Sequence, residues 1–80
     1  MYSNSKFDIF DESEFELGNK AKIVVQQKRI NGEFKIDVRV WMQKGVSNDY
    51  YPLKSGVCVR NSVIRDKLLP ILNDLISKYE

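Results

Sequence analysis

The sequence predicts an α+β domain in which a four-stranded antiparallel sheet is followed by a C-terminal helix, with the domain forming a dimer. Two observations lead to this prediction. An Asn-Gly pair lies between two long runs of β-forming residues, and the apolar residues of the last segment recur with helical spacing. A chain of 80 residues has room for one hydrophobic core. Its composition, 42% hydrophobic and 30% charged, is that of a globular domain.

The strongest local signal is Asn31-Gly32, because both residues tolerate the positive φ angles of a two-residue hairpin turn. We therefore expect strands at 22–30 and 33–43. The short loop fixes their register, and directly opposed side chains share a face of the sheet. One face is then an apolar core and the other is basic with an exposed aromatic ring. The core face holds Ile23, Val25, Phe34, Ile36, Val38, Val40 and Met42, and the basic face holds Lys22, Val24, Gln26, Lys28, Lys35, Asp37, Arg39 and Trp41.

Lys28 lies directly opposite Lys35 in this register. Like charges at opposed positions destabilise a sheet by roughly a few tenths of a kcal/mol. A phosphate group between the two ammonium groups would turn this repulsion into attraction. The alternative is that the two long side chains splay apart in water.

We expect a third strand at 46–51, a loop at 52–56 and a short fourth strand at 57–59. Residues 1–14 are polar and acidic and predict a flexible arm, so the folded domain spans 15–80. The apolar Phe7, Ile9 and Phe10 indicate that part of this arm docks on the domain.

The C-terminal segment predicts a helix with Asn61 or Ser62 as its N-cap. Pro70 falls on the side of this helix away from its apolar residues, so it would kink the helix or divide it into two shorter ones. The apolar arc spans about 160°, whereas a helix lying on one sheet needs a stripe of roughly 100°. The excess indicates a second burial surface, which a homodimer would provide. Its interface would contain Leu68, Leu69, Leu72, Leu75, Ile76 and Tyr79.

Several function classes are excluded by missing residues. The chain has no histidine and a single cysteine, so Ser-His and Cys-His catalysis, an internal disulfide and a Cys-x-x-Cys zinc site are all ruled out. We therefore expect no enzyme, no catalytic residues, no metal and no cofactor. No apolar run approaches the roughly 18 residues that span a bilayer. We expect an intracellular protein with no membrane partner, in the nucleus if eukaryotic and in the cytoplasm if bacterial or viral.

The formal net charge of +2 conceals an uneven distribution. Residues 1–18 hold one lysine and five acidic residues, a net of −4, whereas residues 19–65 hold ten basic and three acidic residues, a net of +7. A basic central segment suits an anionic partner. We hypothesise that the acidic arm competes with that partner for the basic face; the alternative is a solubilising tail.

Three local patterns occur in a characteristic order: Phe15-Glu16-Leu17-Gly18, the strand from Ile36 to Trp41, and Pro52-Leu53-Lys54-Ser55-Gly56-Val57-Cys58-Val59. Together they resemble the single-stranded-DNA-binding domain of the transcriptional coactivator positive cofactor four, over about residues 15–79. One departure is Ser55, where relatives commonly carry a basic residue before the glycine. The resemblance implies a homodimer whose helices pair and whose two sheets form curved ridges that take single-stranded or unpaired DNA.

The residues point independently to the same ligand. Basic side chains neutralise phosphates, and Trp41 offers a face on which a base can stack. We therefore expect a single-stranded-DNA-binding protein without sequence specificity, acting in transcription regulation or in replication and repair. RNA and melted duplex are further candidate ligands, and transcription or replication proteins are candidate partners. The candidate nucleic-acid-binding residues are Lys20, Lys22, Lys28, Arg29, Lys35, Arg39, Trp41, Lys44, Tyr50 and Lys54.

The alternative function is a protein-interaction module that binds no nucleic acid. In that case Trp41, Tyr50 and Tyr51 would form an aromatic patch on the sheet for a protein partner.

Overall fold

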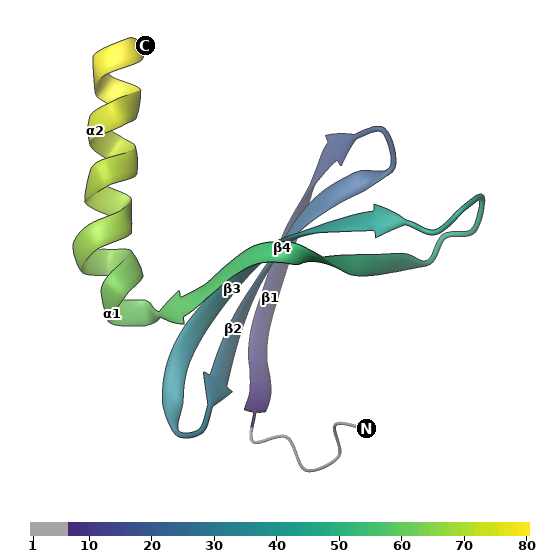
Figure 1. Ribbon diagram of the computed structural model, residues 1–80, viewed down its shortest axis with the longest axis horizontal. Helices are drawn as coiled ribbons and strands as arrows, with labels where there is room; N and C mark the ends of the chain where they lie inside the picture. Colours follow the sequence, from purple (N-terminus) through teal and green to yellow (C-terminus); the bar gives the residue numbers. More distant parts are fainter. Residues whose placement is uncertain (1–6) are drawn as a thin grey trace.

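The computed structural model describes residues 7–80, which form four strands followed by a helical run (Figure 1). The strands pair in the order β1-β2-β3-β4, so each one is antiparallel to the strand that follows it in sequence. The predicted class, a four-stranded antiparallel sheet followed by a C-terminal helix, is confirmed. Within residues 7–80, no helix combines the length and apolar character needed to cross a membrane. The strands are β1 (Phe7–Gly18), β2 (Ala21–Ile30), β3 (Glu33–Gln43) and β4 (Tyr50–Arg60).

The hairpin of β2 and β3 has the predicted register. Asn31 and Gly32 have φ angles of 52° and 85°, as a two-residue turn of this kind requires. Lys28 pairs with Lys35, and Lys22 pairs with Trp41. The predicted division of these strands into two faces is therefore confirmed.

The first strand corrects the prediction of a flexible arm over residues 1–14. Residues 1–6 lie outside the described part of the chain, but residues 7–14 belong to β1 and are hydrogen-bonded to β2. The pairing places Phe15 opposite Ile23 and Glu16 opposite Lys22. The acidic residues join the sheet because β2 offers apolar neighbours and positive charges, and Glu14 Oε1 lies 3.0 Å from Lys22 Nζ.

The expected strands at 46–51 and 57–59 are wrong as separate elements, because residues 50–60 form one strand, β4. The expected loop at 52–56 lies inside this strand, at an irregularity between the pairs Trp41–Pro52 and Arg39–Gly56. Arg39 holds the irregular stretch in place. Its Nη1 donates hydrogen bonds to the carbonyl oxygens of Leu53 and Lys54, at 3.0 and 2.8 Å.

The helical run consists of α1 (Asn61–Val63), a π-helical turn η1 (Ile64–Leu68) and α2 (Leu69–Tyr79). The wide π-helical turn ends at Leu68, two residues before Pro70, which has no N–H to donate. The chain stays helical through the proline instead of dividing there.

The N-cap is Arg60, not Asn61 or Ser62 as predicted. The Asn61 side chain is bound to the sheet instead. Its Nδ2 donates to Gln27 Oε1 at 2.8 Å, and Gln27 Nε2 donates back to Asn61 Oδ1 at 3.1 Å. This reciprocal amide pair ties the start of the helical run to β2.

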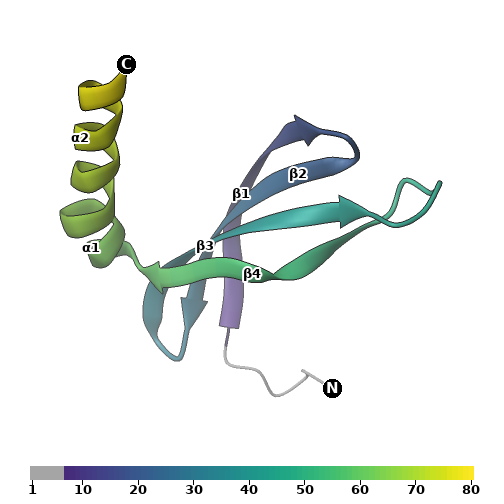
Figure 2. The same cartoon turned by 45° about the horizontal axis from the view of Figure 1, so that its top comes forward.

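The helical run extends away from the sheet and does not cover it (Figures 1 and 2). The predicted core face therefore stays partly open, and Phe34 on it is 51% exposed. The buried apolar residue in the described chain is Val24, at 3% exposure, and it lies on the basic face. Its cross-strand neighbours are Glu14 on β1 and Arg39 on β3. The prediction that the apolar face is the buried one is wrong for the isolated chain.

Candidate nucleic-acid interface

The basic face brings together the five principal residues predicted from the sequence. Lys22 and Lys28 project from β2, and Lys35, Arg39 and Trp41 project from β3, on the same side of the sheet. Tyr50 of β4 joins them, because Lys22 Nζ lies 4.3 Å from the centroid of its ring. This contact is a cation–π interaction. The face thus combines cations with aromatic surface.

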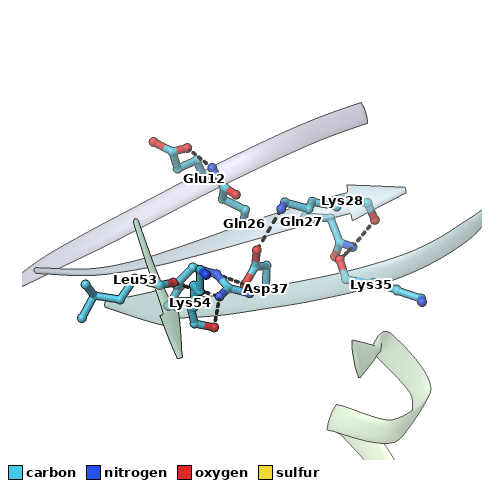
Figure 3. Close-up of polar contacts among 9 residues, drawn as sticks. Glu12, Gln26, Gln27, Lys28, Lys35, Asp37, Leu53 and Lys54 are labelled. Atoms are coloured by element: carbon cyan, nitrogen blue, oxygen red, sulfur yellow. Dashed lines mark hydrogen bonds and ion pairs between the residues drawn. The ribbon is translucent and has the colours of Figure 1, made fainter. Parts of the chain in front are cut away.

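Asp37 organises the centre of this face. Its side chain is only 7% exposed and lies between two cations. Lys28 Nζ donates to Oδ2 at 2.8 Å, and Arg39 Nε donates to Oδ1 at 3.1 Å (Figure 3 shows the Lys28 contact). A buried carboxylate requires such partners, because an unpaired charge in this position would cost several kcal/mol, on the order of 3–5. The side chains of Asp37, Lys28 and Arg39 together carry one net positive charge, and the carboxylate holds both cationic groups in place.

Gly56 makes room for Arg39 and is not among the site residues predicted from the sequence. A Cβ atom at this position would lie 2.8 Å from the Val38 carbonyl oxygen and 3.0 Å from Arg39 Cζ. Only glycine therefore lets the guanidinium lie across β4 toward the carbonyl groups of Leu53 and Lys54. The available signal was a glycine inside a run of β-forming residues, which often marks a close approach.

Two further residues of this face were missed as site residues. Arg60 pairs with Lys35 across β3 and β4, so it adds a cation to the same side. Gln26 is 8% exposed, and its Nε2 donates to Glu12 Oε1 at 2.7 Å. The alternation of Val57 and Val59 with Cys58 would have placed Arg60 on this side.

The Lys28–Lys35 pair has its predicted position, but its repulsion is relieved within the protein. Lys28 turns to Asp37, and Lys35 Nζ lies 3.9 Å from a Glu33 carboxylate oxygen. A bridging phosphate is therefore not needed to explain why two lysines face each other.

A cavity of about 260 Å³ opens on the basic face beside the indole ring of Trp41. Trp41 and Pro52, which pair directly across β3 and β4, form its apolar walls. The remaining lining residues are polar or charged: Gln26, Lys28, Asp37 and Arg39.

Some predicted residues lie elsewhere. Arg29 projects from the opposite face, where its Nη2 lies 3.3 Å from Asp8 Oδ2, so it is separated from the basic face. Lys20 occupies the turn between β1 and β2 with a φ angle of 63°. Lys44 lies in the loop between β3 and β4, and Lys54 lies in the irregular stretch of β4.

The proposed aromatic patch of Trp41, Tyr50 and Tyr51 does not form. Tyr51 pairs with Met42 on the apolar face, whereas Tyr50 contacts Lys22 on the basic face. The three rings therefore lie on two sides of the sheet.

An acidic row borders the basic face along β1. Glu16 and Glu12 lie opposite Lys22 and Gln26, so they share the face of those residues, and Glu14 lies between them. The face is consequently divided, with negative charge along β1 and positive charge along β2 and β3. This border could not be located from the sequence, because most of the segment was expected to be an arm.

The residues predicted for a dimer interface lie on the helical run. Leu69, Leu72, Leu75, Ile76 and Tyr79 are all exposed. Leu68 is partly buried and lines an apolar groove of about 260 Å³ between the helical run and β4. The groove is also lined by Val57, Val59, Val63, Lys67 and Ile71.

The fold places the chain structurally with homologues of positive cofactor four (PC4). One is a PC4 homologue from Burkholderia pseudomallei, with a TM-score of 0.65 and 15% identity over 85% of this chain and 96% of that one. Another is the bacteriophage T5 homologue of the eukaryotic transcription coactivator PC4, which is implicated in recombination-dependent DNA replication. It has a TM-score of 0.64 and 17% identity over 86% of this chain and 81% of that one. The TM-scores show a shared fold, and at identities this low the comparison shows the fold alone. No protein-family model matches the sequence, and no curated protein matches it in sequence.

Proposed function

We propose that this protein binds single-stranded DNA on its basic face and acts in transcription regulation or in DNA replication or repair. The observation that carries the proposal is the arrangement around Asp37, which fixes the cationic heads of Lys28 and Arg39 beside Trp41. Cations held in this way neutralise phosphates and release counterions. The indole ring offers a stacking surface worth about 1–3 kcal/mol per base. The fold shared with PC4 homologues supports the same function.

The acidic row on β1 limits where the strand can run. Phosphates are repelled by Glu12, Glu14 and Glu16, so the backbone of a bound strand would follow β2, β3 and β4. Lys35 and its cross-strand partner Arg60 then extend the binding surface away from the acidic border. Contacts to phosphate carry no sequence information, so this part of the binding is independent of base sequence.

The proposed functional unit is a homodimer. The isolated chain buries little apolar surface, while Leu72, Leu75 and other side chains of the helical run are exposed together with Val57 of the sheet. Small domains have marginal cores of their own, and large exposed apolar patches mark interaction sites. Sedimentation equilibrium should give a dimeric mass, and Leu72→Glu should give a monomer. A monomeric wild-type protein at micromolar concentration would refute this part of the proposal.

The binding function is tested by titrating a labelled single strand and its duplex at about 50 and about 200 mM salt. We expect the single strand to bind more tightly than the duplex and to lose affinity steeply as salt rises. A protein-interaction module predicts no such binding. Failure to bind any nucleic acid at the lower salt concentration would refute the proposal.

A further inference from the structure

The polar groups of the cavity beside Trp41 alternate between donors and acceptors. The Asp37 carboxylate lies between the ammonium group of Lys28 and the guanidinium group of Arg39. Each carboxylate oxygen has two lone pairs, and an ammonium group has three N–H donors, of which Lys28 uses one on Asp37. Arg39 has its Nε and Nη1 donors committed and its Nη2 lies 3.1 Å from Asp37 Oδ1, so one N–H of Nη2 is left for a ligand. The floor of the cavity thus offers the remaining donors of Lys28, an unused lone pair on Asp37 Oδ2 and the remaining donor of Arg39.

These groups are held rigidly. Arg39 cannot turn away, because its Nη1 is bound to the carbonyl oxygens of Leu53 and Lys54. The side chains of Lys28 and Arg39 are only 17% and 22% exposed, and Asp37 is more deeply buried. A ligand that fits this order loses little free energy to ordering the protein, which is the benefit of preorganisation.

Gln26 adds a second acceptor. Its amide nitrogen is committed to Glu12 at 2.7 Å, and no group within residues 7–80 donates to its side-chain oxygen. The residue is 8% exposed and lines the cavity. The oxygen is therefore still open to solvent and free to accept from a ligand that brings a donor.

We propose that the cavity binds the base of a thymine or uracil nucleotide, an inference that rests on the proposed binding of single strands. Thymine and uracil carry an imide N–H between two carbonyl oxygens, which is the complement of the floor. The carbonyl oxygens accept from Lys28 and Arg39, and the imide N–H donates to Asp37 or Gln26. The ring lies against Trp41 and Pro52.

The other bases match the floor less well. Cytosine and adenine each place an amino group, a donor, where the cavity has a cation. Guanine presents two neighbouring donors and a single carbonyl. The cavity therefore distinguishes thymine and uracil within a surface that otherwise binds phosphates without regard to sequence.

The experiment compares oligothymidylate with oligocytidylate of equal length, by fluorescence anisotropy at one salt concentration and slightly alkaline pH. We expect oligothymidylate to bind more tightly by about tenfold, since a bidentate base contact discriminates by roughly that factor or more. An oligomer of N3-methylthymine keeps the charge and the ring but lacks the imide N–H. It should bind no better than oligocytidylate.

Equal affinity for oligothymidylate and oligocytidylate, each still sensitive to salt, would overturn this inference and leave the proposed function standing. Binding of neither oligomer would refute the proposed function and the inference with it. Undiminished binding of the N3-methylthymine oligomer would also overturn the inference, because the central donor would then play no part.

Two variants locate the effect. Asp37→Asn should reduce the preference for oligothymidylate to about twofold or less, because its amide replaces one acceptor by a donor. Lys35→Ala removes a cation of the same face that does not line the cavity. It should weaken binding to both oligomers by the same factor. An Asp37→Asn protein that folds and keeps the full preference for oligothymidylate would overturn the inference. If this variant does not fold, the N3-methylthymine measurement on the wild-type protein still tests the inference.

Discussion

Replacing Gly56 by alanine tests how β4 and Arg39 fit together. The new methyl group would lie 2.8 Å from the Val38 carbonyl oxygen and 3.0 and 3.1 Å from Arg39 Cζ and Cγ. The carbonyl oxygen belongs to the backbone of the neighbouring strand and cannot move independently. The strands must separate locally, or Arg39 must leave its position.

The expected loss of stability follows from these two responses, separation of the strands or displacement of Arg39. Overpacking of this kind costs about 1–3 kcal/mol. Displacing Arg39 also gives up its hydrogen bonds to Leu53 and Lys54, and a bond from a charged donor contributes about 1.5–3 kcal/mol when well buried. Because the Arg39 side chain is 22% exposed, solvent lowers that contribution. Gly56→Ala should therefore destabilise the fold by about 2–4 kcal/mol.

Urea denaturation followed by circular dichroism measures this loss, at a fixed protein concentration so that association does not shift the midpoint. Gly45→Ala is the matched control. Gly45 has a positive φ, of 60°, but no atom lies within 4 Å of the position that a Cβ would take there, so only the backbone cost of about 1 kcal/mol applies. If Gly56→Ala unfolds at the same urea concentration as wild type or as this control, the close approach of Arg39 is not what requires glycine.

Three further predictions concern the turn before β2 and the binding face. Lys20→Gly should raise the free energy of unfolding by up to about 1 kcal/mol, because glycine adopts a positive φ without strain; urea denaturation measures this, and an unchanged midpoint would contradict it. Glu14→Gln should tighten single-strand binding by about two- to fivefold, because it releases Lys22, an effect that high salt should abolish. Trp41→Ala should weaken binding by about 1–3 kcal/mol with the salt dependence retained. A reduced salt slope in that variant would mean that the indole acts by positioning cations.

The hairpin of β2 and β3 could be predicted residue by residue. Asn31 and Gly32 permit one tight turn, and a two-residue loop leaves no freedom in the register. Lys22, Lys28, Arg39 and Trp41 were therefore placed on one face from the sequence alone.

The course of β4 could not be predicted in the same way. Pro52 and Gly56 are loop signals by their local preferences, and the strand continues through them because Arg39, distant in sequence, supplies donors to Leu53 and Lys54. Propensity describes the segment alone, whereas this stabilisation comes from another strand.

The prediction of a flexible acidic arm was wrong for a related reason. Its charges resemble those of a solvated tail, but Glu14 and Asp8 find partners in Lys22 and Arg29 once β2 is in place. The helical run differs again. Its apolar pattern predicts a buried face, but periodicity does not reveal what would cover that face, and the sheet of the same chain leaves it exposed.

The strictly sequential order of the sheet has a consequence for how the protein is made. Because every strand pairs with its neighbour in sequence, the contacts are local and little loop-closure entropy is lost in forming them. Each hairpin can close once its second strand has left the ribosome, before the helical run is synthesised. Sheet formation is then a unimolecular step that does not depend on protein concentration. Any pairing of two chains follows as a slower, concentration-dependent step, so the two events should separate in refolding experiments.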